Sequence, residues 1–313
     1  MKRCRQWPTL LFSGMTIAAV ALVPVHAADA PPRAGAICDR DCLKGFVDRY
    51  LDALVAHDPG RLPLARDVRF TENTVRLNLG EALWETASGV GAYKIYLADP
   101  YSNQAGFIGV VMENGAPRLL ALRLLIKDGR IREIETIIAR SGLLGDFPAE
   151  TSTRQAKPIW SETLKPTERS ARLAMVAATN QYFEGMEQNT GEVVPFDASC
   201  NRTENGVQTT NNPSLKPPPG VPPAAGGVNI GAMGCKEQFN LGGVNIYSTP
   251  ERRFWMVDEE RGLVLGVFMF TIKSAHAAIP IAELFKVKNG RLYEIEAVGV
   301  MGTGLPYGAR SGW

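Results

Sequence analysis

The sequence of 313 residues lacks a strong excess of either charge. It has 34 Lys and Arg against 32 Asp and Glu, a formal net charge of +2, so it has no basic surplus to neutralise nucleic-acid phosphates. Hydrophobic residues make up 45% of the chain and charged residues only 21%, unlike disordered proteins. We therefore expect a globular protein, two domains on grounds of length, and no nucleic-acid partner.

Histidine is scarce, and only His57 and His276 lie beyond the N-terminal segment. Zinc is a competing interpretation of the close pair Cys38 and Cys42, but no paired histidines lie nearby. No glycine-rich pattern follows a strand and opens a helix, and no serine sits in a nucleophile-elbow pattern. We expect no metal and no nucleotide cofactor, and a hydrolase is not favoured.

The sequence also lacks a hydrophobic run as long as a membrane span. Its N-terminal apolar run, 10–23, is shorter than the ~20 residues that a span needs. Three basic residues precede this run, and small residues follow it as far as Ala30. This layout is typical of a secretory signal over residues 1–30, with an uncleaved anchor as the alternative. We expect a periplasmic or secreted protein without a stable membrane span after signal removal.

Four cysteines follow the predicted signal: Cys38, Cys42, Cys200 and Cys235. An even number in an exported chain favours disulfides, and local pairing is the simplest of the three possible connectivities.

The chain contains an internal repeat. A shift of 132 residues superposes Tyr50 on Tyr182 and the segment Thr-Glu-Asn at 71–73 on that at 203–205. Further along, a shift of 161 superposes residues 126–135 on 287–296. The two shifts, 161 and 132, differ by 29 residues, which the second copy carries as an insertion near the Pro/Gly-rich stretch 211–234. We expect a long loop there, and an alternative role for it is to dock another protein through extended proline segments.

Each copy is predicted to open with an amphipathic helix, because apolar residues recur at helical spacing over 43–55 and 173–186. Strand patterns follow, with hairpin turns at Asp128-Gly129 and Asn289-Gly290. The order predicts an α+β fold of helix and mostly antiparallel sheet. The expected strands are 107–112, 119–126, 131–138, 254–257, 263–272, 281–287 and 292–300.

This order of elements, with the Thr-Glu-Asn segment and the hairpin pattern Lys-Asp/Asn-Gly-Arg-Ile/Leu-x-Glu-Ile-Glu, resembles the nuclear transport factor 2-like, or SnoaL-like, superfamily. That superfamily includes ketosteroid isomerases and scytalone dehydratase. The resemblance implies two cone-shaped units, each a curved sheet around helices with an apolar cavity, arranged as a pseudo-dimer in one chain, and a possible homo-oligomer. The expected domains are 37–142 and 168–304, with a linker at 143–167 and a tail at 305–313.

Several residues are candidates for chemistry at such a cavity. Tyr182 sits mid-helix and could donate a proton or simply pack in the core. Glu204 could act as general acid or base, although Thr-Glu-Asn in both copies also fits a structural hydrogen-bonding role. Arg202, two residues earlier on the same strand face, could anchor an anionic group or pair with Glu204. His276 could shuttle protons at the cavity rim or lie exposed in a loop, and His57 most simply ends a helix.

The second copy is rich in aromatic residues, which would suit a flat ligand, and Trp255, Phe239 and Phe268 are the predicted substrate-binding members. The sequence thus favours an exported, cofactor-independent acid–base enzyme, a lyase, dehydratase or isomerase, that acts on a small apolar or aromatic molecule. The predicted catalytic residues are His276, Glu204 and Tyr182. The alternative is a non-catalytic ligand-binding or protein-interaction module.

Overall fold

The structure is a computed structural model that describes residues 38–142, 147, 149–215, 228–241, 247–272, 277–300, 305–306 and 309. The predicted signal segment and residues 216–227 of the insertion lie outside these ranges. Within them, no helix is long and apolar enough to span a membrane.

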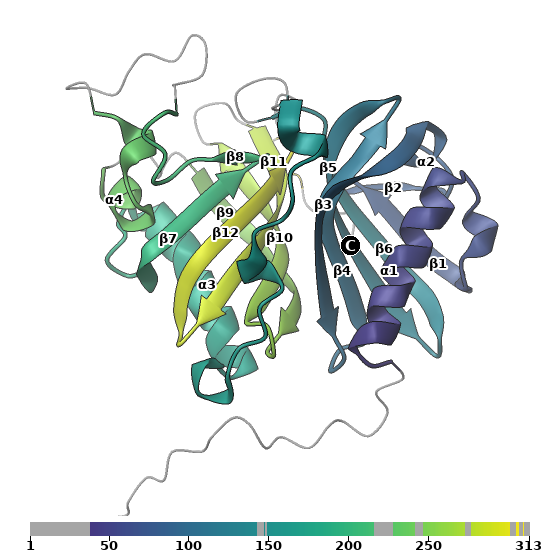
Figure 1. Cartoon of the computed structure of the whole chain (residues 1–313), viewed down its shortest axis with the longest axis horizontal. Coiled ribbons are helices and arrows are strands. Elements are labelled where there is room, and N and C mark those ends of the chain that lie inside the picture. The colour runs from purple at the N-terminus through teal and green to yellow at the C-terminus, as the bar shows by residue number, and fades with distance from the viewer. Residues whose placement is uncertain are drawn as a thin grey trace, which may run out of the picture.

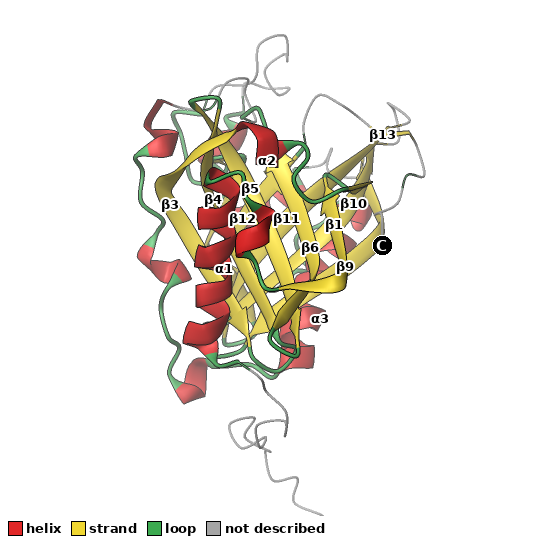
Figure 2. Cartoon of the chain, turned by 90° about the vertical axis from the view of Figure 1, so that its right-hand side faces the viewer, coloured by secondary structure: helices red, strands yellow, loops and turns green. Residues whose placement is uncertain are grey.

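The first unit begins with the predicted helix, whose N-terminus Asp39 caps by accepting a hydrogen bond from the backbone N–H of Cys42 at 2.9 Å. A curved sheet follows, and α1 crosses one of its faces (Figure 2). The elements are α1 (Arg40–Val55), β1 (Leu64–Glu72), β2 (Val75–Leu77), α2 (Leu83–Thr86), β3 (Ala87–Asp99), β4 (Gln104–Glu113), β5 (Ala116–Lys127) and β6 (Arg130–Ala139), with a 3-10 turn at Pro59–Arg61.

The second unit repeats this order after three 3-10 turns at Ala149–Ser152, Pro158–Trp160 and Pro166–Glu168. Its additional helix, α4, follows the insertion and a 3-10 turn at Ile230–Ala232. The elements are α3 (Arg172–Gln188), β7 (Phe196–Glu204), β8 (Val207–Gln208), α4 (Cys235–Asn240), β9 (Tyr247–Asp258), β10 (Leu263–Ile272), β11 (Ala277–Lys288), β12 (Arg291–Gly299) and β13 (Leu305–Pro306).

The two sheets have the same strand order, β2-β1-β6-β5-β4-β3 and β8-β7-β12-β11-β10-β9, so the prediction of two similar α+β units is confirmed. Four strands of each form the expected antiparallel meander, and both hairpin turns have positive φ at Asp128-Gly129 and Asn289-Gly290. One feature differs from the sequence prediction, because β1 pairs with β6, and β7 with β12, in parallel. Each sheet is therefore mixed at one edge.

The core has three parts. One apolar cluster lies between α1 and the first sheet, and a second lies between α3 and the second sheet. A third lies between the two sheets, where residues such as Ile108 and Leu119 of the first unit join Met256 and Leu265 of the second. The sheets consequently pack against each other at the centre of the molecule, with α1 and α3 on the outside (Figure 1).

Candidate functional site

A cavity of about 140 Å³ lies in the second unit, between α3 and the concave face of its sheet. Most of its wall is apolar. Four polar or charged residues lie at one end of the cavity, in addition to Asn205 of the repeated segment. The lining residues are Tyr182, Met186, Arg202, Glu204, Asn205, Phe270, Ile279, Ile281, Glu283, Ala297 and Gly299.

Tyr182 reaches this cavity from the buried face of α3 and is only 1% exposed. Its ring is fixed by an edge contact with Phe285 and a tilted contact with Phe239, with ring centroids 5.3 and 5.2 Å away. The packing leaves the hydroxyl as the polar part of the residue at the cavity.

Arg202 and Glu204 lie on β7, and their side chains share one face, as the two-residue strand period predicts. The guanidinium Nη2 of Arg202 donates to a carboxylate oxygen of Glu204. A second nitrogen, Nη1, donates to Gln238 at 3.3 Å. The third, Nε, is buried and has no partner among the described residues. The Nε–H of Arg202 is thus left for a ligand.

Glu283 on β11 completes the site, and it was not among the residues predicted from the sequence. Its side chain is buried, with 3% exposure, and the hydroxyl of Tyr182 donates to it. Its Oε2 atom has no partner within the described part of the chain. Burial, helped by the charge of Glu204, raises the pKa of Glu283 to about 8 in spite of Arg202 and the Tyr182 hydrogen bond. The carboxyl group therefore holds its proton at neutral pH.

The sequence does contain a signal for Glu283, which is a single acidic residue within the apolar run 277–285 of β11. Under the shift of 161, its counterpart in the first unit is Leu122, and under the shift of 132 the counterpart of Arg202 is Phe70. Leu122 and Phe70 are both buried in the first unit's core. Apolar side chains therefore replace the charged pair in the first unit, and the polar site is particular to the second.

The repeated Thr-Glu-Asn segment has mainly a structural role, and its asparagine performs it. Asn73 accepts from the backbone N–H of Ile138 at 2.7 Å, and Asn205 accepts from that of Gly299 at 2.8 Å. Both asparagines have positive φ, a conformation that asparagine tolerates. Glu72 bonds Arg140 and the backbone N–H of Leu83, whereas Glu204 faces the cavity.

The structure describes one of the two predicted histidines, His57, and not the other, His276. His57 follows α1 directly, as predicted, and its Nδ1 contacts the carbonyl of Trp84. His276 lies outside the described residues, in the connection between β10 and β11. Its proposed catalytic role therefore stays a prediction.

The aromatic residues predicted to bind substrate do not line the cavity. Trp255 belongs to the apolar cluster between the sheets, because its strand position points away from α3. Phe268 and Phe239 lie in the core beneath α3, where Phe268 packs on Phe183 at 4.1 Å between ring centroids. Phe270, Ile279 and Ile281 form the apolar wall instead. The aromatic surplus therefore builds the core that supports the site.

The helix α4, which follows the insertion, contributes to the site. The cysteines pair locally, Cys38 with Cys42 and Cys200 with Cys235, and the second bond ties the start of α4 to β7, two residues before Arg202. Gln238 of α4 accepts from Arg202, and the Phe239 ring lies 5.5 Å from its guanidinium. No group of three or more His, Cys, Asp or Glu side chains in the described ranges is placed to hold a metal ion.

A family model described as "Domain of unknown function (DUF8021)" matches residues 168–299. The match covers the second unit. No curated protein matches the chain.

Among solved structures, an NTF2-like protein of unknown function from Cytophaga hutchinsonii is similar at 11% identity and a TM-score of 0.27, covering 31% of this chain and 90% of that one. A putative ketosteroid isomerase from Kribbella flavida is similar at 17% identity and a TM-score of 0.26, covering 35% and 93%. An uncharacterized protein with a cystatin-like fold from Silicibacter pomeroyi is similar at 14% identity and a TM-score of 0.24, covering 34% and 77%. The fold assignment rests on the strand order described above.

Proposed function

We propose that the protein is an exported, cofactor-independent acid–base enzyme, a lyase, dehydratase or isomerase, whose site is the cavity of the second unit. The observation that carries this proposal is the buried carboxyl group of Glu283, which has an unpartnered oxygen in an otherwise apolar cavity. An acid whose pKa lies near neutral pH transfers protons most effectively, and that of Glu283 is about 8.

The chemistry would begin with a carbonyl oxygen of the substrate entering the polar end of the cavity. Protonated Glu283 donates to that oxygen, and Nε of Arg202 stabilises the negative charge that develops there. Tyr182, already bonded to Glu283, orients the carboxyl group. Glu204 supplies a second carboxylate to accept a proton from carbon, and His276 remains a further candidate for that base.

The cavity size restricts the substrate. About 140 Å³ is close to the roughly 150 Å³ cavity that accommodates benzene in another protein. We therefore propose a small apolar or aromatic molecule with a single ring or a compact bicyclic frame.

The proposal treats the chain as a pseudo-dimer of cone domains at 37–142 and 168–304, in which the first unit is a scaffold. The two disulfides and the lack of a membrane-spanning helix among the described residues are compatible with an exported protein.

The test is exchange of α-hydrogens of cyclohexanone and 1-indanone in D₂O, followed by proton NMR. We expect the wild type to accelerate exchange, and Glu283→Gln to lose about 10²-fold or more of that rate because the acid is gone. The control is Glu85→Gln, an exposed glutamate of the first unit. Equal rates for wild type and Glu283→Gln would refute the assignment. Saturable ketone binding without exchange would favour the alternative, a non-catalytic ligand-binding module.

A further inference from the structure

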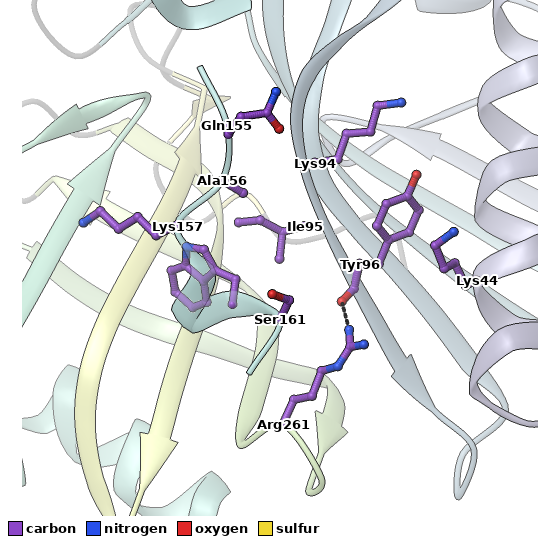
Figure 3. Close-up of a pocket in the computed structure, with 10 residues that line it drawn as sticks. Lys44, Lys94, Ile95, Tyr96, Gln155, Ala156, Lys157, Ser161 and Arg261 are labelled. Atoms are coloured by element: carbon purple, nitrogen blue, oxygen red, sulfur yellow. Dashed lines mark hydrogen bonds between the residues drawn. The ribbon is translucent and has the colours of Figure 1, made fainter. Parts of the chain in front are cut away.

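A second hollow, of about 300 Å³, follows the edge of the first sheet at β3. Its walls come from α1, from β3, from the connection between the units and from the turn between β9 and β10 (Figure 3). In Figure 3, Lys44, Lys94 and Tyr96 lie on one side of β3, while Ile95, Ala156 and Ser161 lie on the other. We call this hollow the β3 groove; its remaining lining residues are Gln155, Lys157, Trp160 and Arg261.

The β3 groove is lined by four cations and by no carboxylate. Lys157 is neutralised because it pairs with the buried Glu294, and Lys44 has a half-exposed partner in Asp48. Lys94 has no ion-pair partner within the described ranges. The guanidinium of Arg261 donates to an uncharged acceptor, the carbonyl of Tyr96 at 3.4 Å (Figure 3), and has no ion-pair partner among the described residues. The backbone N–H of Arg261 donates to Asp258 at 3.1 Å. Positive charge is therefore left uncompensated in the groove.

The acidic residues of the turn that carries Arg261 do not supply the missing charge. Arg40 binds Asp258 through two nitrogens, at 2.5 and 2.7 Å, and also binds Glu260 at 2.8 Å. Both carboxylates are thereby committed to another cation. The third, Glu259, accepts from the backbone N–H of Arg172 at 3.0 Å, and none of the three forms an ion pair with the guanidinium of Arg261 among the described residues.

Two buried donors at the groove also lack acceptors. Trp160 is only 2% exposed, and its indole N–H has no hydrogen-bond partner among the described residues. The Nε–H of Arg261 is likewise buried and unpartnered there. Buried donors are nearly always paired in folded proteins, so these two N–H groups remain available to an acceptor from outside the chain.

Lysines beside an edge strand also have a structural interpretation, because they prevent pairing with other chains. That role explains exposed Lys94 and Lys44. It explains neither the hollow nor the unpartnered N–H groups of Trp160 and Arg261, two of the residues that line it.

We propose that the β3 groove binds a small anion through carboxylate or phosphate oxygens, which accept from Arg261 and Trp160 and are attracted by Lys94. Charge-assisted hydrogen bonds of this kind are the strong ones, and the planar guanidinium suits both oxyanions. The site is separate from the cavity of the second unit and does not depend on its proposed function.

The test is a titration of the full chain, with ¹⁵N-labelled indole groups, by phosphate and by succinate at constant ionic strength. The Trp160 indole signal is assigned by its loss in Trp160→Phe. We expect a saturable shift of that signal with at least one of the two anions, and none when sodium chloride replaces them. A response to phosphate alone identifies a phosphate ligand, and a response to succinate alone a carboxylate.

The variants Arg261→Gln and Lys94→Gln should each weaken binding, Arg261→Gln by about tenfold because it loses a charged hydrogen bond. Lys127→Gln, an exposed lysine on the β5–β6 hairpin, is the matched control and should bind as wild type does. Lys94 is exposed, so its variant tests the charge without disturbing the core. No saturable shift with either anion, or wild-type affinity in both groove variants, would overturn the proposal.

Discussion

Buried carboxylates in this chain differ in what compensates their charge. Asp99 is bound by Arg172, and Glu72 by Arg140 and a backbone N–H. Glu283 has the hydroxyl of Tyr182 beside it, and its Oε2 atom has no partner among the described residues. An ionised carboxylate in such surroundings is costly, so the neutral acid is the favoured form.

This difference predicts how stability depends on pH. The pKa of Glu283 is raised from 4.5 to about 8, so its stabilising contribution is complete below the unfolded-state pKa and is lost as pH rises through 8. Glutamine stays neutral throughout. From pH 5 to pH 9, the free energy of unfolding of Glu283→Gln should therefore rise relative to wild type, by on the order of a few kcal/mol.

Urea denaturation of both proteins at several pH values measures this difference. Glu85→Gln serves as the control because its side chain is exposed. Parallel stability curves for wild type and Glu283→Gln would contradict a raised pKa.

Among individual residues, Tyr182, Arg202 and Glu204 could be predicted from the sequence because comparison of the two copies of the repeat distinguished them. Glu283 was not predicted as a site residue, because one acidic residue in an apolar strand does not reveal whether its oxygens have hydrogen-bond partners. That depends on α3 and β7, which approach β11 only in the folded chain. The side of the sheet on which Trp255 lies could not be predicted for a similar reason, since residues 254–257 of β9 are apolar on both faces and the sequence does not distinguish them.

Among the elements, α4 most clearly distinguishes the second unit from the first. It holds Arg202 through Gln238 and packs Phe239 against Tyr182. The disulfide to β7 keeps α4 in place. The helix that follows the insertion thus builds part of the site, whereas the proline-rich residues 216–227 lie outside the described ranges.

Removal of this disulfide should affect the site and the stability together. Cys200 and Cys235 are 35 residues apart, and a loop of that length stabilises by about 4 kcal/mol in the chain-entropy model. We expect Cys200→Ala/Cys235→Ala to lose roughly this much stability and to bind 1-indanone more weakly, as measured by urea denaturation and NMR titration.

The variant Cys38→Ala/Cys42→Ala is the control, since that bond joins residues 4 apart at the start of α1 and touches no cavity residue. It should bind 1-indanone as wild type does. If both double variants bind equally well, α4 does not support the site.

Element prediction succeeded where periodicity was strong, as in α1 and in the strands β4 to β6 and β10 to β12. It missed β1, and of β7 it placed only Arg202 and Glu204 on a strand, because charged residues interrupt the alternation of both strands. Their parallel pairing with β6 and β12 depends on distant segments. It also missed β3, in which glycine and alanine weaken the strand signal.

On the scale of the whole molecule, the two sheets share one interface. Residues of both units form its apolar cluster. One acidic residue of each unit also bonds a residue of the other unit. Glu135 of the first unit binds Arg253 of the second at 2.6 Å, and its counterpart under the shift of 161, Glu296, bonds Tyr93 of the first. Each unit therefore covers the apolar sheet face of the other.

Separating the units should expose that face. We expect residues 37–142 and 143–304, expressed singly, to aggregate or remain unfolded, because a large exposed apolar patch is unstable in water. Co-expressed, the two pieces should purify together as a soluble complex. Two soluble, folded monomers would contradict the importance of the shared core. Size-exclusion chromatography and circular dichroism distinguish these outcomes.

The second unit holds a protonated carboxyl group at Glu283 in a small cavity, whereas the first unit has the apolar Leu122 at the corresponding position. Direct titration of the Glu283 side-chain carboxyl carbon by ¹³C NMR, with the signal assigned by Glu283→Gln, tests this protonation without knowledge of the substrate. We expect a pKa of about 8. A pKa at or below the ordinary value of 4.5 would contradict it.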